Sequence, residues 1–110
     1  MSSKIFKLYD KPKVLVVEDN SYCIKMFASI LTSINYEFVI LENADDGIQT
    51  FRQSIKSGFI YDFIFMKLIM PGTNGYDAVK EMRKIENEYR FNDADRHLIC
   101  GLSAEISESK

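Results

Sequence analysis

Two adjacent carboxylates, Glu18 and Asp19, follow an apolar run from Val14 to Val17. Carboxylate oxygens suit Mg2+, which keeps several of its own waters, so one or two carboxylates are enough for a site. An acidic residue at this position can equally well cap a helix that follows. Taken alone, the pair leaves a magnesium site and a solvated helix cap as open alternatives.

Strand-like and helix-like segments alternate along the chain. The apolar, β-branched segments that predict strands are 13–18, 37–42, 63–66 and 97–101. Between them, apolar residues recur at spacings of three and four, which predicts amphipathic helices. The predicted buried stripes are Ile24, Phe27, Ala28, Leu31 and Ile34, then Ile48, Phe51 and Ile55, then Ala78, Val79, Met82, Ile85 and Tyr89. The polar stretch 86–95 is expected to fray into a loop.

This order predicts an α/β fold, a doubly wound parallel sheet with helices on both faces and right-handed crossovers. Ligands of such open sheets bind at the carboxyl ends of the strands. That edge would collect Glu18 and Asp19 after the first strand, residues 67–75 after the third, and Ser103 after the fourth.

Composition narrows the class of protein. The formal charge of −2 and the pI near 5.4 argue against a nucleic-acid-binding surface. No segment is apolar and long enough to cross a bilayer, and we expect a cytoplasmic protein. Cys23 and Cys100 lack metal-ligand spacing and are expected to be reduced thiols in the core. His97 is expected to be a turn residue rather than a phosphodonor.

Three blocks of sequence resemble the receiver domains of response regulators. Residues 14–20, Val-Leu-Val-Val-Glu-Asp-Asn, resemble the opening of such a domain. Residues 62–66, followed by Met70-Pro71 and Asn74-Gly75, resemble its third strand and the loop after it. Residues 98–104 resemble its fourth strand. The resemblance implies a flavodoxin-like receiver fold and a role in a phosphorelay.

The resemblance also implies roles for individual residues. Glu18 and Asp19 would be the acidic pair that holds Mg2+, with the backbone carbonyl of Ile69 as a further ligand. Ser103 would supply the hydroxyl group that contacts a phosphoryl group and transmits the signal. Pro71 and Gly75 would shape the loop that borders the pocket.

Lys67 departs from the family pattern, because it stands where the phosphate-accepting aspartate is expected. A lysine cannot form the acyl phosphate that a carboxylate forms with a phosphohistidine donor. Its ammonium group would repel Mg2+, and we expect it to pair with Glu18 and Asp19 instead of extending into solvent. The magnesium site would then be weakened.

The end of the chain is the second departure. Residues 1–12 are interpreted as a lead-in or linker, and 13–110 as a receiver-like domain with four of the usual five strands. The fourth helix, the fifth strand with its lysine, and the fifth helix are expected to be absent. Lys110 follows Ser103 too closely to be that lysine.

The sequence bears on three candidate functions. The first is a pseudo-receiver, a non-enzymatic module that binds a histidine kinase, a histidine phosphotransfer domain, or an attached kinase or output domain. The second is a phosphorylatable receiver in which Lys67 substitutes the acceptor aspartate. The third, a flavodoxin-like cofactor binder, is rejected because Glu18-Asp19-Asn20 is acidic where a phosphate-binding loop should offer N–H groups.

Overall fold

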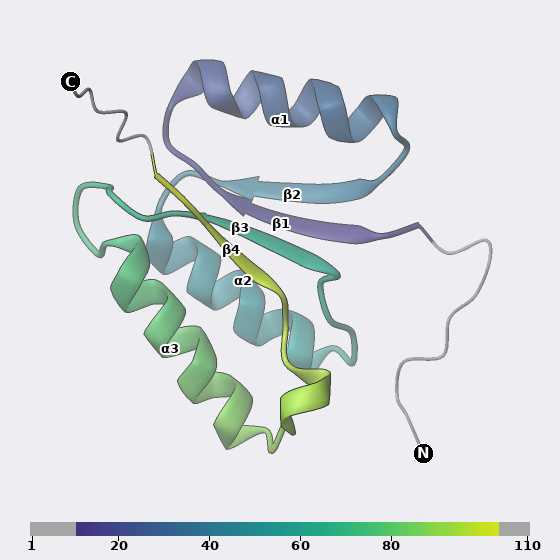
Figure 1. Ribbon diagram of the computed structural model, residues 1–110, viewed down its shortest axis with the longest axis vertical. Coiled ribbons are helices and arrows are strands. Elements are labelled where there is room, and N and C mark those ends of the chain that lie inside the picture. The colour runs from purple at the N-terminus through teal and green to yellow at the C-terminus, as the bar shows by residue number, and fades with distance from the viewer. Residues whose placement is uncertain (1–10, 104–110) are drawn as a thin grey trace.

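The computed structural model describes residues 11–103 as a four-stranded sheet with three α-helices (Figure 1). The strands are β1 (Lys13–Val17), β2 (Glu37–Leu41), β3 (Phe63–Lys67) and β4 (Ile99–Leu102). The helices are α1 (Ser21–Ser33), α2 (Ala44–Lys56) and α3 (Gly75–Glu88), with a 3-10 turn, η1 (Asp93–Asp95), before β4. The order of elements predicted from the sequence is confirmed.

All neighbouring strands are parallel, in the order β2-β1-β3-β4. Val17 of β1 lies opposite Leu41 of β2 and Met66 of β3, and Lys67 lies opposite Leu102 of β4. The carboxyl ends of the strands therefore meet along one edge of the sheet, which is where the predicted site residues follow β1, β3 and β4.

Helices cover both faces of the sheet, as predicted: α1 lies on one face, and α2 and α3 lie on the other (Figure 1). Alternate residues of β1 point to the two sides of the sheet, and all four residues from Val14 to Val17 are buried. The α2/α3 layer contains Leu15, Val17, Ala44, Phe51, Ile64, Met66, Ala78, Met82 and Ile85. The α1 layer contains Val14, Val16 and Leu31, with Phe27, Ile40, Phe63 and Phe65 packed against them. β1 is thus a central strand without an exposed face.

An asparagine caps the start of each α-helix in the described chain. The side-chain oxygens of Asn20, Asn43 and Asn74 each accept a hydrogen bond from the backbone N–H three residues further on. These caps satisfy donors that have no partner within the helix. The cap of α1 is therefore Asn20 and not Asp19, so the carboxylate of Asp19 is available for the strand edge.

Several predictions around α1, α3 and β4 were wrong in detail. Ile34 lies beyond the end of α1 and is exposed, and Tyr89, which ends α3, is exposed as well. The stretch that was expected to fray from Glu86 remains helical to Glu88, and Glu86 is fully buried. β4 begins at Ile99, two residues later than predicted, because the backbone of His97 is hydrogen bonded to α3 instead of to the sheet.

The cysteines also differ from the prediction. Both are free thiols, but Cys100 is exposed on β4 and Cys23 is only half-buried on α1, so neither belongs to the core. No helix within residues 11–103 has the length and apolar character needed to cross a membrane.

Candidate functional site

The candidate site lies where β1, β3 and β4 end. β1 delivers Glu18 and Asp19, and β3 extends one residue further than predicted, so Lys67 is its last residue. Ser103 follows Leu102, the residue opposite Lys67, and is exposed. The parallel register alone therefore brings the predicted site residues to the same edge of the sheet.

Lys67 bridges the two carboxylates. Its Nζ lies 2.8 Å from Asp19 Oδ1 and 3.1 Å from Glu18 Oε2. Glu18 is 4% exposed, and the same Oε2 accepts a hydrogen bond of 3.0 Å from the backbone N–H of Asn20. This is the internal ion pair expected from the sequence, and it gives a nearly buried carboxylate two donors.

The ion pairs keep Lys67 charged. Hydrogen bonds to Asp19 and then to Glu18 raise the pKa of the Lys67 amino group above its ordinary value of 10.5, although partial burial opposes them. The Glu18 and Asp19 side chains are 5% and 32% exposed, and their carboxylates would repel each other without a cation between them. The ammonium group therefore supplies the positive charge that this edge needs.

In this arrangement the residues do not fit Mg2+. A magnesium ion needs oxygen ligands at about 2.0–2.1 Å in octahedral geometry, and the Lys67 ammonium group already occupies the space between the two carboxylates. Among residues 11–103, no group of three or more acidic, histidine or cysteine side chains is arranged to hold a metal ion. Ile69, whose carbonyl the family resemblance implies as a further ligand, follows β3 by two residues and has an exposed side chain.

Gly75 fixes the loop that follows Lys67. It is the first residue of α3, its N–H donates to the Leu68 carbonyl at 2.9 Å, and it is buried. A Cβ atom at this position would collide with the backbone of Lys67 and Leu68. Glycine is therefore what allows α3 to begin directly against the end of β3.

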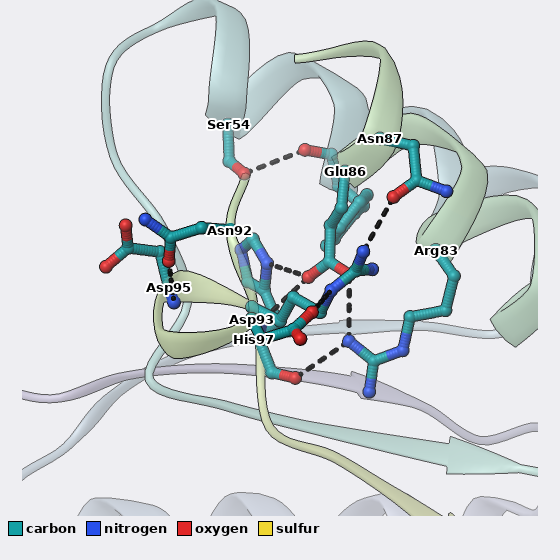
Figure 2. A network of polar contacts seen from close by, with 10 residues as sticks. Ser54, Arg83, Glu86, Asn87, Asn92, Asp93, Asp95 and His97 are labelled. Atoms are coloured by element: carbon teal, nitrogen blue, oxygen red, sulfur yellow. Dashed lines mark hydrogen bonds and ion pairs between the residues drawn. The ribbon is translucent and has the colours of Figure 1, made fainter. Parts of the chain in front are cut away.

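A second polar cluster, which the sequence reasoning missed, lies at the other end of α3 (Figure 2). Glu86 is fully buried, and its carboxylate contacts Arg83, Arg96 and His97. Burial raises the pKa of this carboxyl group, but hydrogen bonds from Arg83 and His97 outweigh burial and leave the pKa below its usual value.

The sequence did contain a signal for this cluster. Glu86 follows Ile85 and comes four residues after Met82, which places it beside the apolar stripe of α3. A carboxylate on a buried helix face needs charged or N–H donors, and Arg83 and Arg96 were candidates for them. His97 was predicted as a turn residue, but it is buried.

Comparison with known proteins agrees with this fold. Residues 14–91 match the response regulator receiver domain family. Hybrid signal transduction histidine kinase I of Dictyostelium discoideum is 31% identical over 74 residues, which are 67% of this chain and 4% of that protein. Transcription factor SKN7 of Chaetomium thermophilum is 31% identical over 75 residues, 68% of this chain and 9% of that protein. The chain therefore spans less than a tenth of either relative.

Solved receiver domains have the same architecture. The receiver domain of the histidine kinase CKI1 from Arabidopsis thaliana, complexed with Mg2+ and BeF3−, superimposes with a TM-score of 0.77 and 25% identity, covering 89% of this chain and 69% of that chain. The receiver domain of Ssk1, solved with the Saccharomyces cerevisiae histidine phosphotransfer protein Ypd1, gives a TM-score of 0.66 at 25% identity, covering 94% and 69%. With its parallel sheet and the match over 14–91, the chain belongs to the response regulator receiver domain family, whose members are signalling modules of two-component and phosphorelay systems.

Proposed function

We propose that this chain is a pseudo-receiver, a phosphorelay module that binds partner proteins but is not phosphorylated at the usual position. The observation that carries the proposal is the position of Lys67 at the end of β3, with its ammonium group between Asp19 and Glu18. Acyl phosphate formation requires a carboxylate nucleophile. A protonated amine has neither a carboxylate oxygen nor a free lone pair, so the acceptor is missing.

The ammonium group also competes with the cation that receiver chemistry would use. The CKI1 receiver domain was solved with Mg2+ and BeF3−. Here Mg2+ would have to displace a tethered charge that already contacts both carboxylates. Because the lysine is part of the chain, it returns to the carboxylates without any loss of translational freedom. Magnesium binding should therefore be weak.

The aspartates that could replace the acceptor are poorly placed. Asp62 precedes β3 at the opposite edge of the sheet, where its Oδ2 accepts a hydrogen bond of 2.7 Å from the Lys13 backbone N–H. Asp19 lies at the correct edge, but its Oδ1 is bound to Lys67. Neither offers a free carboxylate beside an empty cation site.

The helix next to this site offers a surface for a partner. Four large apolar side chains are exposed at intervals of four residues along and just beyond α1: Tyr22, Met26, Ile30 and Ile34. α1 begins directly after Asn20, so this stripe starts beside the Lys67 site. An exposed apolar stripe of this kind is typical of a protein-binding surface. The Ssk1 receiver domain binds the phosphotransfer protein Ypd1, and a histidine phosphotransfer domain or a histidine kinase is the class of partner we propose.

The first experiment records amide NMR spectra with and without Mg2+ and beryllofluoride, a mimic of the phosphorylated aspartate. The unmodified chain, the variant Lys67→Asp and the control Lys84→Asp, at an exposed lysine of α3, are compared. We expect only Lys67→Asp to respond, with shifts near Glu18, Asp19 and Ser103. Such shifts in the unmodified chain would contradict the proposal, as would transfer of phosphate to Asp19 or Asp62 from a phosphohistidine donor.

The second experiment measures binding to Ypd1 by calorimetry in the absence of Mg2+ and phosphodonor. We expect binding by the unmodified chain and about tenfold weaker binding by Ile30→Lys, because a charge would enter an apolar contact. Gln49→Lys, exposed on α2 across the sheet, is the matched control and should bind like the unmodified chain. Binding that appears only with Lys67→Asp and beryllofluoride would support a phosphorylatable receiver instead.

A further inference from the structure

β4 is the edge strand of the described sheet. On one side it pairs with β3, where the N–H groups of Ile64 and Leu68 donate to the carbonyls of Leu98 and Leu102 at 3.0 and 2.9 Å. Within residues 11–103 no strand pairs with its other side. An edge strand held by one ladder is expected to open more easily than the central strands.

His97, two residues before β4, is held by α3 instead of by the sheet. Glu86 Oε2 accepts a hydrogen bond of 2.6 Å from the His97 backbone N–H, and Arg83 Nη1 donates to the His97 carbonyl at 3.0 Å. Arg83 Nη1 also contacts Glu86 Oε1 at 2.8 Å, so the two side chains hold each other in place. Figure 2 shows both groups converging on His97 from α3. Both backbone polar groups of one residue are thus fixed by a single turn of helix.

The side chain of His97 reinforces this attachment. Its Nδ1 lies 2.8 Å from Glu86 Oε2. A carboxylate with a lowered pKa is ionised and can only accept, so Nδ1 carries the hydrogen. The ring also packs against Phe51 of α2 and Phe91, with centroid distances of 4.6 and 5.5 Å. The residue that leads into β4 is therefore held by α2 and α3 together.

The loop between α3 and β4 is tied to the same carboxylate. Arg96 Nη1 lies 3.3 Å from Glu86 Oε1, while its Nη2 donates to Asn87 Oδ1 at 2.7 Å and its Nε to Asp93 Oδ1 at 3.2 Å. Every contact of the Glu86 carboxylate therefore reaches the segment between α3 and β4 or the arginine that holds it. The contacts of Glu86 are thus concentrated on the segment that leads into β4.

We propose that Glu86 is a positioning residue: it anchors the start of β4 and thereby keeps Ser103, at the other end of this four-residue strand, beside Lys67. When the anchor is lost, β4 and Ser103 open as a unit while β1 and β2 stay paired. The alternative is a cluster that adds only to the overall stability of the domain. This inference does not rest on the proposed function, because it makes no assumption about what the Lys67 site binds.

Native-state hydrogen exchange followed by NMR tests the proposal on the whole chain. The variant is Glu86→Gln, and the matched control is Glu88→Gln, which removes the exposed pair of Glu88 with Arg52 of α2 but no contact to β4. The N–H groups of Ile64 and Leu68 report on β4, and the N–H of Glu18, which donates to the Leu41 carbonyl at 3.0 Å, reports on β1 and β2.

In Glu86→Gln we expect exchange at Ile64 and Leu68 to accelerate about tenfold or more relative to Glu18, since a charged hydrogen-bond acceptor is lost. The Ser103 amide resonance should shift or broaden in the same variant, and Glu88→Gln should change none of these signals. Equal acceleration at all three amides, or none, would overturn the proposal. If Glu86→Gln does not fold, Arg83→Met is used instead, because it removes the hydrogen bond to the His97 carbonyl. Its readout is again the exchange rate at Ile64 and Leu68 relative to that at Glu18.

Discussion

Lys67 Nζ and Asp19 Oδ1 lie 2.8 Å apart across the ends of the two central strands, β3 and β1. Glu18 Oε2 is 3.1 Å from the same nitrogen, so one ammonium group pairs with two acidic groups that a receiver would offer to a metal ion. Lys67 therefore offsets one of the two negative charges at this edge of the sheet without a bound cation. The consequence can be measured as a change in stability and in cation dependence.

Replacing Lys67 with methionine should destabilise the domain and make its stability depend on Mg2+. The variant leaves Glu18, 4% exposed, beside Asp19 with no cation, and we expect a loss of about 1–3 kcal/mol in the free energy of unfolding. Mg2+ binds only the folded variant, so added Mg2+ should recover part of the loss. Urea unfolding with and without millimolar Mg2+ measures both effects.

Lys84→Met, at an exposed position of α3, is the control for the loss of a positive charge. Its stability should be nearly unchanged and should not respond to Mg2+. A Lys67→Met variant as stable as the unmodified chain would show that Lys67 does not stabilise the pair of carboxylates. Equal Mg2+ dependence of the two proteins would show that the lysine does not exclude the ion.

Acid should remove the stabilisation that Glu86 provides. The pKa of Glu86 is lower in the folded protein than its ordinary value of 4.5, so around that pH the unfolded chain binds more protons than the folded protein. The stabilisation that ionised Glu86 provides is therefore fully present above pH 4.5. It is lost as the pH falls through the pKa that Glu86 has in the folded protein. At neutral pH we expect Glu86→Gln to cost about 2 kcal/mol.

The measurement compares urea unfolding of the unmodified chain and Glu86→Gln from about pH 7 to about pH 3. The difference between the free energies of unfolding of the two proteins should shrink as the pH falls. The other carboxylates titrate in both proteins, so their contributions cancel in this difference. A difference that stays constant with pH would show that the charge of Glu86 does not contribute. Glu88→Gln should show a small difference at every pH, because its pair with Arg52 is exposed.

Much of the fold and part of the site could be predicted because they depend on local sequence patterns. The unbroken apolar run Val14 to Val17 predicted a buried central strand, and the parallel register then carried Glu18 and Lys67 to the same edge. Opposite charges on adjacent strand ends pair whatever the details of the loops. The ion pair therefore followed from topology and charge.

The Glu86 cluster was not predictable in the same way. Its partners Arg96 and His97 are ten and eleven residues away, and they meet Glu86 only because the chain turns back after α3. The polar residues from Glu86 onward predicted a frayed helix end. Hydropathy alone cannot distinguish an exposed carboxylate from a buried one that is paired with charged groups of the same protein. The start of β4 was misplaced for the same reason, because His97 bonds to α3 and not to the sheet.

Arg90 should be a site where glycine stabilises the domain. Its φ is 62°, in the left-handed region, because it follows the cap residue of α3 and allows Phe91 N–H to donate to the Glu86 carbonyl. Gly58 has the equivalent place after α2, with φ of 90°. We expect Arg90→Gly to raise the free energy of unfolding by about 0.5–1 kcal/mol.

Thermal or urea unfolding measures the effect, and Arg90→Ala is the control. Alanine removes the same side chain but keeps the Cβ atom, so it should give no comparable gain. An equal gain from alanine would mean that the arginine side chain, and not the backbone conformation, is unfavourable. A loss of stability in Arg90→Gly would contradict the account of this helix end.

The glycines around the Lys67 site should differ in their tolerance of a methyl group. At Gly75 a Cβ atom would collide with the backbone of Lys67 and Leu68, which cannot move without displacing the ion pair. At Gly47 it would lie 2.6 Å from Val17 Cγ2, and at Gly101 3.0 Å from Leu68 Cδ1. Both of these neighbours are side-chain atoms, and the leucine is the more flexible. We therefore expect Gly75→Ala to cost about 3 kcal/mol, Gly47→Ala less, and Gly101→Ala least.

Urea unfolding gives the order of the three costs, and the NMR signals of Glu18 and Asp19 report whether the ion pair has moved. Gly75→Ala should shift both signals, because the colliding backbone belongs to the residue that carries the ammonium group. Gly101→Ala should leave them in place, since Leu68 can rotate away from the added methyl group. A Gly75→Ala variant with unmodified stability and unmodified signals would show that α3 can retreat from β3 at no cost, and that glycine is not what brings the loop to Lys67.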